Sequence, residues 1–254
     1  GREQDKVFMV MEYFDHDLKT CIEKHDGPFS QGDVKAFLAQ LLAGVSFLHS
    51  KWFMHRDIKT SNLLYQNSRG RLALADFGLA RRFGDPAPSD PPYTRNVVTL
   101  WYRAPELLLG AETYAGPDLD LWAVGCVFAE LLLKRPLFQG KSELEHLSQI
   151  FKVLGLPTDD RWPAFKDLPV AKSFTFKAQR RSRLRDTLPT TAFRGASDAT
   201  PLSESGLDLL GSHLLALDPA QRTSAAHAAK HPYFSESPLP TPRHLMPRFQ
   251  LDRL

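Results

Sequence analysis

Cysteine is scarce in this sequence, with Cys21 and Cys126 as the two examples in 254 residues. Two cysteines supply neither a disulfide framework nor a four-ligand zinc site, and so we expect a reducing, intracellular setting. No apolar run approaches the ~20 residues that a membrane-spanning helix needs. No charged and apolar leader opens the chain. We therefore expect no membrane partner.

A charge excess of one sign is also lacking. Lys and Arg number 32 against 29 Asp and Glu, which gives a net charge of +3. Nucleic-acid-binding domains concentrate basic residues on one face, and so we expect no nucleic-acid partner. The densest basic stretch, at 177–185, has two interpretations that the sequence leaves open: a solvated face, or a docking surface for acidic partners.

The remaining composition is typical of a globular protein with a large core, since hydrophobic residues make up 43% and charged residues 24%. Apolar residues recur at helical spacing over 31–50, where Ser30 and Asp33 form a capping pair. Further helices are expected at 18–24, at 118–133, from Ser142 to Leu154, and at 205–217 and 223–230. The segment at 155–201 is expected to be irregular.

Strand signals are few. Residues 7–13, VFMVMEY, have the pattern of a short buried strand. The runs NLLY and RLALAD are separated by QNSRG, which predicts a hairpin. The expected fold class is mainly α with small β-hairpins.

Three polar clusters stand in fixed order: HRDIKTSN at 55–62, DFG at 76–78 and APE at 104–106. Phosphoryl transfer needs such a combination of groups. One carboxylate orients a hydroxyl group and accepts its proton, and an ammonium group neutralises charge on the moving phosphoryl group. An amide oxygen and a second carboxylate can hold Mg²⁺, which prefers oxygen ligands.

With these motifs the chain resembles the eukaryotic protein kinases, from Val7 to about Lys230. The resemblance implies ATP and Mg²⁺ as cofactors. It assigns the catalytic base to Asp57 and the charge-neutralising amine to Lys59. The implied metal ligands are Asn62 and Asp76.

The resemblance also implies a scaffold around these residues. Glu106 would pair with Arg222, and Asp120 would accept hydrogen bonds from the backbone of the catalytic loop. At the hinge, Met11 would be the gatekeeper and Leu64 would lie beneath the adenine ring. Nucleotide binding would further involve the residues Glu12, Phe14 and Asp17.

The segment VVTLWYRAPELLLG at 97–110 is similar to the cyclin-dependent kinases. There Thr99 would bond to Asp57 and Lys59, and the adjoining pocket would favour Ser-Pro or Thr-Pro sites, because proline lacks an N–H group. HRDIKTSNLL, GKSELEHLSQIFKVLGLPT and the PLP…LMPRF tail resemble the PITSLRE-type kinases and their plant class G relatives. The implied partners are a cyclin and protein substrates.

Thr94 stands where such kinases carry an activating phosphothreonine, written by a separate activating kinase. Arg56 and Arg81 would grip its phosphate. The sequence lacks the parts of a kinase small lobe: it has no G-x-G, no V-A-I-K lysine and no helix with the partner glutamate before the hinge.

The expected organisation follows from this pattern. Residues 1–16 would end a small lobe and form the hinge, and 17–234 would form the large lobe. Within it the activation segment is 76–106 and an insert spans about 155–201, with a Pro-rich extended tail at 235–254. We expect the natural chain to extend upstream, this segment alone to transfer little phosphate, and the protein to reside in the nucleus, the cytoplasm or both. The alternative is a non-catalytic truncated lobe that acts as an interaction module.

Overall fold

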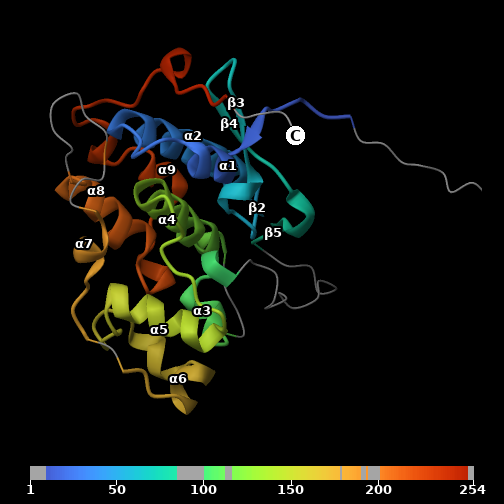
Figure 1. Ribbon diagram of the computed structural model, residues 1–254. Coiled ribbons are helices and arrows are strands. Elements are labelled where there is room, and N and C mark those ends of the chain that lie inside the picture. The colour runs from blue at the N-terminus through green and yellow to red at the C-terminus, as the bar shows by residue number, and fades with distance from the viewer. Residues whose placement is uncertain are drawn as a thin grey trace, which may run out of the picture.

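The computed structural model describes residues 10–84, 100–111, 116–177, 179–189, 193 and 201–250. Two long helices, α2 (Gln31–Ser50) and α4 (Asp118–Leu133), lie at the centre of the fold (Figure 1). Shorter helices and two small sheets surround them. Within the described ranges no helix has the length and apolar character needed to cross a membrane.

The two central helices form at the residues where the sequence predicts them. Ser30 caps α2 by accepting a hydrogen bond from the Asp33 amide at 3.0 Å. Every residue of α4 from Leu119 to Leu132 is buried, because α2 and the segment from 209 to 214 pack against it. The predicted helices α1 (Leu18–Lys24) and α5 (Glu143–Leu154) are also confirmed.

Two small antiparallel sheets frame the polar loops. The predicted hairpin is confirmed as β3 (Leu63–Gln66) and β4 (Arg71–Leu74), and β1 (His16–Asp17) joins it in the order β1-β3-β4. The second sheet pairs β2 (Phe53–Met54) with β5 (Arg81–Arg82). The loop at 55–62 connects β2 to β3, and the turn at 76–78 lies between β4 and β5, so both connect the same two sheets.

The predicted buried strand at 7–13 is wrong over residues 10–13, while 7–9 lie outside the described residues. Val10 is 96% exposed and Tyr13 is 74% exposed. A strand forms only where a neighbouring strand satisfies its backbone groups, and no described strand pairs with 10–13. Side chains hold this segment instead: Arg71 donates two hydrogen bonds of 2.9 Å to the Glu12 carboxylate.

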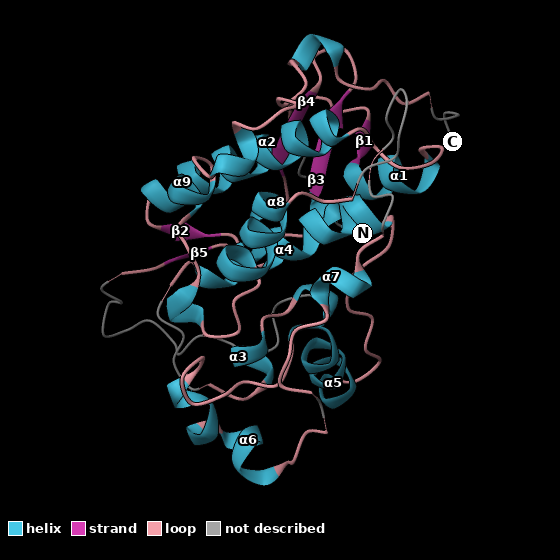
Figure 2. Cartoon of the chain, turned by 90° about the vertical axis from the view of Figure 1, so that its left-hand side faces the viewer, coloured by secondary structure: helices cyan, strands magenta, loops and turns pink. Residues whose placement is uncertain are grey.

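Short helices build the end of the molecule farthest from the sheets (Figure 2).

The segment at 155–201, predicted to be irregular, contains short helical elements. The helix predicted at 205–217 is divided into α8 and a π-helical turn, and the one predicted at 223–230 is shortened to α9. Further helical elements are α3 (Pro105–Leu108), a 3-10 helix (Pro163–Asp167), α6 (Pro169–Ser173), α7 (Leu184–Thr187), α8 (Glu204–Asp208), the π-helical turn (Leu209–Leu214) and α9 (Ala225–Ala228).

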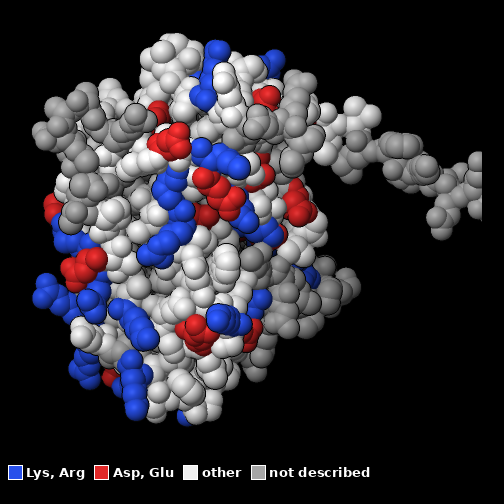
Figure 3. Space-filling model, in the orientation of Figure 1, with Lys and Arg blue, Asp and Glu red and all other residues white. Residues whose placement is uncertain are grey.

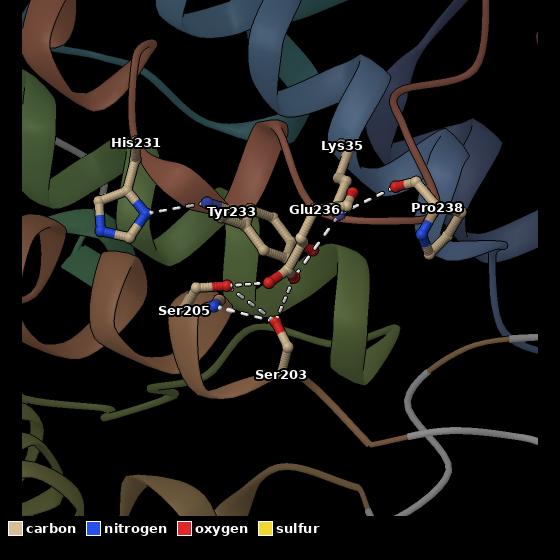
Figure 4. Close-up of polar contacts among 8 residues, drawn as sticks. Lys35, Ser203, Ser205, His231, Tyr233, Glu236 and Pro238 are labelled. Atoms are coloured by element: carbon tan, nitrogen blue, oxygen red, sulfur yellow. Dashed lines mark hydrogen bonds and ion pairs between the residues drawn. The ribbon is translucent and has the colours of Figure 1, made fainter.

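The tail at 235–250 lies against α2 and the three-stranded sheet (Figure 1). The fully buried amine of Lys35 donates to the carbonyl groups of Glu236 and Pro238 at 2.9 Å each (Figure 4). Ser203 and Ser205 donate to the Glu236 carboxylate. Desolvation lowers the pKa of Lys35. A buried ammonium group thus fixes the start of the tail.

The far end of the tail contributes to the core. Met246 is 4% exposed and Phe249 is 8% exposed. Asn67 accepts a hydrogen bond from the Phe249 amide and donates one to its carbonyl oxygen, at 2.9 and 2.8 Å. Tyr65 donates to the Pro247 carbonyl oxygen at 2.8 Å. These contacts give the Pro-rich tail a defined path over the helical lobe.

Acid should weaken this fold through one buried imidazole. Burial and the nearby Arg103 charge lower the pKa of His146 from 6.5 to about 4. Its Nδ1 accepts from the Gly140 amide at 3.3 Å, and a Cβ at Gly140 would collide with His146. In the unfolded state His146 binds a proton below about pH 6.5, whereas in the folded state it does so only below about pH 4. Stability is therefore lost as pH falls through this window, by about 3 kcal/mol at most.

We expect His146→Asn to flatten the dependence of unfolding free energy on pH between 6.5 and 4, because the variant has no group to protonate. Denaturation at several pH values measures the slope. The control is His244→Asn, which removes an exposed imidazole and should leave the slope unchanged. Equal slopes in His146→Asn and the unsubstituted chain would contradict the assignment.

Candidate active site

The loop at 55–62 is held from beneath by one carboxylate in the first turn of α4. Asp120 is 1% exposed and accepts hydrogen bonds of 2.8 Å from the amides of His55 and Arg56. It also contacts Nε2 of His49, on α2, at 2.8 Å. Arg56 has a left-handed backbone, with φ of 67°. This conformation is rare for a residue with a Cβ, and the two amide bonds to Asp120 hold it.

Asp57, Lys59 and Asn62 meet on this loop. Lys59 Nζ lies 2.7 Å from Asp57 Oδ2, and Asn62 Nδ2 donates to the same oxygen at 2.9 Å. Asn62 Nδ2 also donates to the Asp57 carbonyl oxygen at 2.8 Å. The carboxylate is thereby fixed, in a position that is 5% exposed. A fixed carboxylate next to an ammonium group can accept a proton from a hydroxyl and neutralise nearby negative charge.

Asp76 is attached to this cluster through its neighbour. The Ala75 amide donates to the Asn62 carbonyl oxygen at 2.9 Å, and His55 Nε2 lies 3.0 Å from the Ala75 carbonyl oxygen. Asp76 itself has φ of 62° and is exposed. The Phe77 ring rests against the His55 ring, with centroids 5.0 Å apart.

The donor set of Asn62 and Asp76 fits Mg²⁺. Both hydrogen bonds from Asn62 to Asp57 use Nδ2, so the amide oxygen is the atom of Asn62 that could bind a metal. The exposed Asp76 carboxylate supplies a second hard oxygen donor.

A cavity of about 420 Å³ opens beside Lys59. Its floor is a buried network in which Tyr102 donates to Glu130 Oε2 at 2.6 Å and Thr60 donates to Glu130 Oε1 at 3.0 Å. Burial raises the pKa of Glu130, and the two donors oppose this shift. Other lining residues are Lys19, Ile22, Glu23, Ser61, Trp101, Lys134, Arg135 and Pro136.

Glu106 and Arg222 form a bidentate ion pair, with Nη–Oε distances of 2.6 and 2.7 Å. Their side chains are 4% and 0% exposed. The Arg222 guanidinium also donates to the Ala216 and Asp118 carbonyl oxygens. The pair therefore joins α3 to the start of α4 and to the loop after the π-helical turn.

The nucleotide-binding candidates lie in two places, the β1–β3 strand pair and the irregular segment before β1. Asp17 and Leu64 are register partners in β1 and β3, so these two lie side by side. Asp17 also caps α1, because its carboxylate accepts from both the amide and the hydroxyl of Thr20. Met11 is 73% exposed.

Arg71 is a residue that sequence reasoning missed. It holds Glu12, and its guanidinium lies 5.3 Å from the Phe14 ring centroid. The hydrogen-bonded partners Arg71 and Glu12 are 59 positions apart, and no local pattern links them.

Thr94 and Thr99 lie outside the described residues. The two arginines predicted to serve Thr94 are described. Arg56 Nε donates to the Leu79 carbonyl oxygen at 2.7 Å, which ties the loop to the segment after Phe77. Arg81 stands on β5 opposite Met54, two residues before Arg56. The sheet thus brings the two arginine backbones close together.

The basic stretch lies near the lower left of the molecule, where Lys and Arg outnumber acidic residues on the visible face (Figure 3). The hollow in this region is nevertheless lined by both signs, including Arg161, Arg181, Asp186 and Glu204. Arg185 is paired with Glu204. This balance favours the interpretation as a solvated face over a dedicated site for acidic partners.

The sequence motifs and the geometry of the site agree with a match to a family model. The model described as "Protein kinase domain" matches residues 2–234. The chain belongs to the protein kinase family. Its fold is accordingly the protein kinase fold, rich in helices and with few strands.

Curated relatives narrow the family further. The chain is 50% identical to cyclin-dependent kinase G-2 of rice over 100% of its own length and 35% of the relative. It is 46% identical to cyclin-dependent kinase 11 of Dictyostelium discoideum, over 97% of this chain and 64% of that one. These are cyclin-dependent kinases of the G and PITSLRE types, as the motifs predicted. The chain spans about a third of the length of the rice relatives it matches.

A solved structure agrees with this assignment. A chain in the crystal structure of the yeast RNA Pol II CTD kinase CTDK-1 complex superposes with a TM-score of 0.78 at 36% identity. The match covers 94% of this chain and 77% of that chain.

Breaking the buried ion pair should destabilise the lobe strongly. Glu106→Gln keeps the side-chain volume but leaves the Arg222 charge buried without a counter-charge. We expect a loss of about 3–5 kcal/mol in unfolding free energy, measured by chemical denaturation. The control is Asp159→Asn, which removes an ion pair to Lys166 whose side chains are about 70% exposed, and which should cost less than about 1 kcal/mol. Similar losses of unfolding free energy in both variants would show that the buried Glu106–Arg222 pair stabilises the fold no more than an exposed pair.

Proposed function

We propose that the protein is a proline-directed serine/threonine kinase that transfers the γ-phosphoryl group of Mg-ATP to Ser-Pro or Thr-Pro sites. The observation that carries this proposal is the joint placement of Asp57, Lys59 and Asn62 on a loop fixed by Asp120. The family match and the names of the relatives support the same activity.

The roles follow from the positions of the groups. The substrate hydroxyl would donate its proton to Asp57 Oδ while its oxygen forms a bond to the γ-phosphorus. The bond from that phosphorus to the β,γ-bridging oxygen breaks, and ADP leaves. Lys59 would neutralise charge on the phosphoryl oxygens, since its ammonium group lies next to Asp57. Asn62 and Asp76 would hold Mg²⁺, which would neutralise charge at the phosphates.

Several finer features belong to the same proposal. Arg103 would shape the pocket that accepts the substrate proline, and its guanidinium is held by Glu143 at 2.5 Å. Thr99 would contact Asp57 and Lys59. An activating kinase would phosphorylate Thr94. Arg56 and Arg81 would then bind the phosphate group and so order the activation segment. A cyclin would be the regulatory partner.

Activity would require residues beyond the large lobe. The 254 residues contain no G-x-G phosphate loop and no V-A-I-K lysine. Kinases use both parts to position the phosphates of ATP. We therefore propose that these 254 residues alone transfer little phosphate, and that a small lobe completes the nucleotide site. The alternative, a purely binding lobe, has no need for the Asp57–Lys59–Asn62 arrangement.

The test uses the full-length kinase with its cyclin. We expect it to phosphorylate a Ser-Pro peptide and to ignore the matched Ser-Ala peptide. Asp57→Asn should lower kcat by about 10²–10⁴, the usual contribution of a general base. Asp159→Asn removes an exposed carboxylate and should leave kcat unchanged.

Three outcomes would each contradict one part of the proposal. Equal rates on the two peptides would remove the proline preference. Unchanged turnover in Asp57→Asn would remove Asp57 as the base and favour the binding-module alternative. Full activity of the 254-residue chain by itself would show that no further lobe is needed.

A further inference from the structure

Three side chains that the phosphotransfer site does not use converge near the C-terminal helices. Asp208 ends α8, His213 lies in the π-helical turn, and His231 precedes the 3-10 helix Pro232–Phe234. Asp208 Oδ2 is 3.5 Å from His213 Nε2 and 3.4 Å from His231 Nε2. One ligand atom from each residue lies within 4.8 Å of the others.

The π-helical turn accounts for this convergence. Residues five apart in an α-helix are rotated by about 140° from each other, so Asp208 and His213 would point in different directions. Between 209 and 214 the helix widens, and the Leu215 amide bonds to the Leu210 carbonyl oxygen, five residues back, at 2.8 Å. The wider turn returns His213 to the face of Asp208. Such π-turns are rare and frequently mark functional sites.

We propose that Asp208, His213 and His231 bind a divalent transition metal of the Zn²⁺ class. Zinc binds imidazole nitrogen and carboxylate oxygen at about 2.0–2.2 Å, so ligand atoms at two corners of a tetrahedron stand about 3.3–3.5 Å apart. The distances from Asp208 Oδ2 to His213 Nε2 and to His231 Nε2 match this edge. Two imidazoles and one carboxylate favour zinc over Mg²⁺ or Ca²⁺, which prefer oxygen.

Exposure leaves room for the remaining ligands. The side chains of Asp208 and His213 are 51% and 38% exposed, while that of His231 is 11% exposed. Water would therefore complete the coordination from the open side. His231 supplies the buried and fixed corner of the site.

The contacts of His231 also set the strength of binding. Its Nδ1 accepts a hydrogen bond from the Tyr233 amide at 3.3 Å (Figure 4). The ring proton therefore resides on Nε2, which lies 3.4 Å from Asp208 Oδ2. Metal binding at Nε2 moves this proton to Nδ1 and removes the bond to Tyr233. That bond is longer than the usual 2.9–3.0 Å, and so its loss is tolerable. The site is consequently weaker than a structural zinc site with four preformed ligands.

Calorimetric titration of the full chain with ZnCl₂, in a buffer free of chelators, tests the proposal. We expect saturable binding at one site, with no comparable binding of MgCl₂. His213→Ala removes an accessible ligand and should weaken Zn²⁺ binding at least about ten-fold. The control is His244→Ala, an exposed histidine outside the cluster, which should leave the affinity unchanged.

A second variant keeps the test decisive if alanine disturbs the helix. His213→Asn retains a polar, exposed side chain but lacks the imidazole, and it should lose Zn²⁺ binding while keeping the metal-free melting temperature. Equal Zn²⁺ affinity in both His213 variants and the unsubstituted chain would overturn the proposal. So would the absence of saturable binding. Neither readout depends on phosphotransfer, and so the result is independent of the proposed kinase activity.

Discussion

The position of the loop at 55–62 depends on the buried carboxylate of Asp120. This side chain satisfies two consecutive amides of the loop and meets His49 of α2, so one group joins the loop to both central helices. Without these bonds the left-handed Arg56 backbone would lose its support. The buried apolar surface of α4 holds this helix in the core, and Asp120 at the start of the helix holds the loop.

A second set of contacts extends this rigidity to the edge of the lobe. The tail from Glu236 to Phe249 runs from α2, where Lys35 binds its start, to β3 and the turn after it, where Tyr65 and Asn67 bind its end. His16 Nε2 also lies 3.2 Å from the Phe249 carbonyl oxygen. Since His16 precedes Asp17, the tail supports the strand that carries one of the nucleotide-binding candidates.

Caps, apolar periodicity and turn residues predicted the elements that form through contacts between residues close together in the sequence. The Ser30 cap, the apolar periodicity of α2, the helix that follows Ser142 and the turn between β3 and β4 each depend on residues close together in the sequence, and each prediction is confirmed. The buried strand at 10–13 was wrong because a strand depends on a partner elsewhere in the chain. The tail contacts and the Arg71–Glu12 pair were missed for the same reason. The π-helical turn was missed because an apolar pattern does not distinguish a π-turn from an α-helix.

The most direct test of the Asp120 account is hydrogen exchange in the unsubstituted chain and in Asp120→Asn. The substituted amide has one oxygen acceptor and presents an N–H₂ group toward backbone donors. The account predicts faster exchange at His55 and Arg56, with the protection of α2 and α4 retained. Unchanged protection of these two amides would contradict it, because the loop would then be held by other contacts.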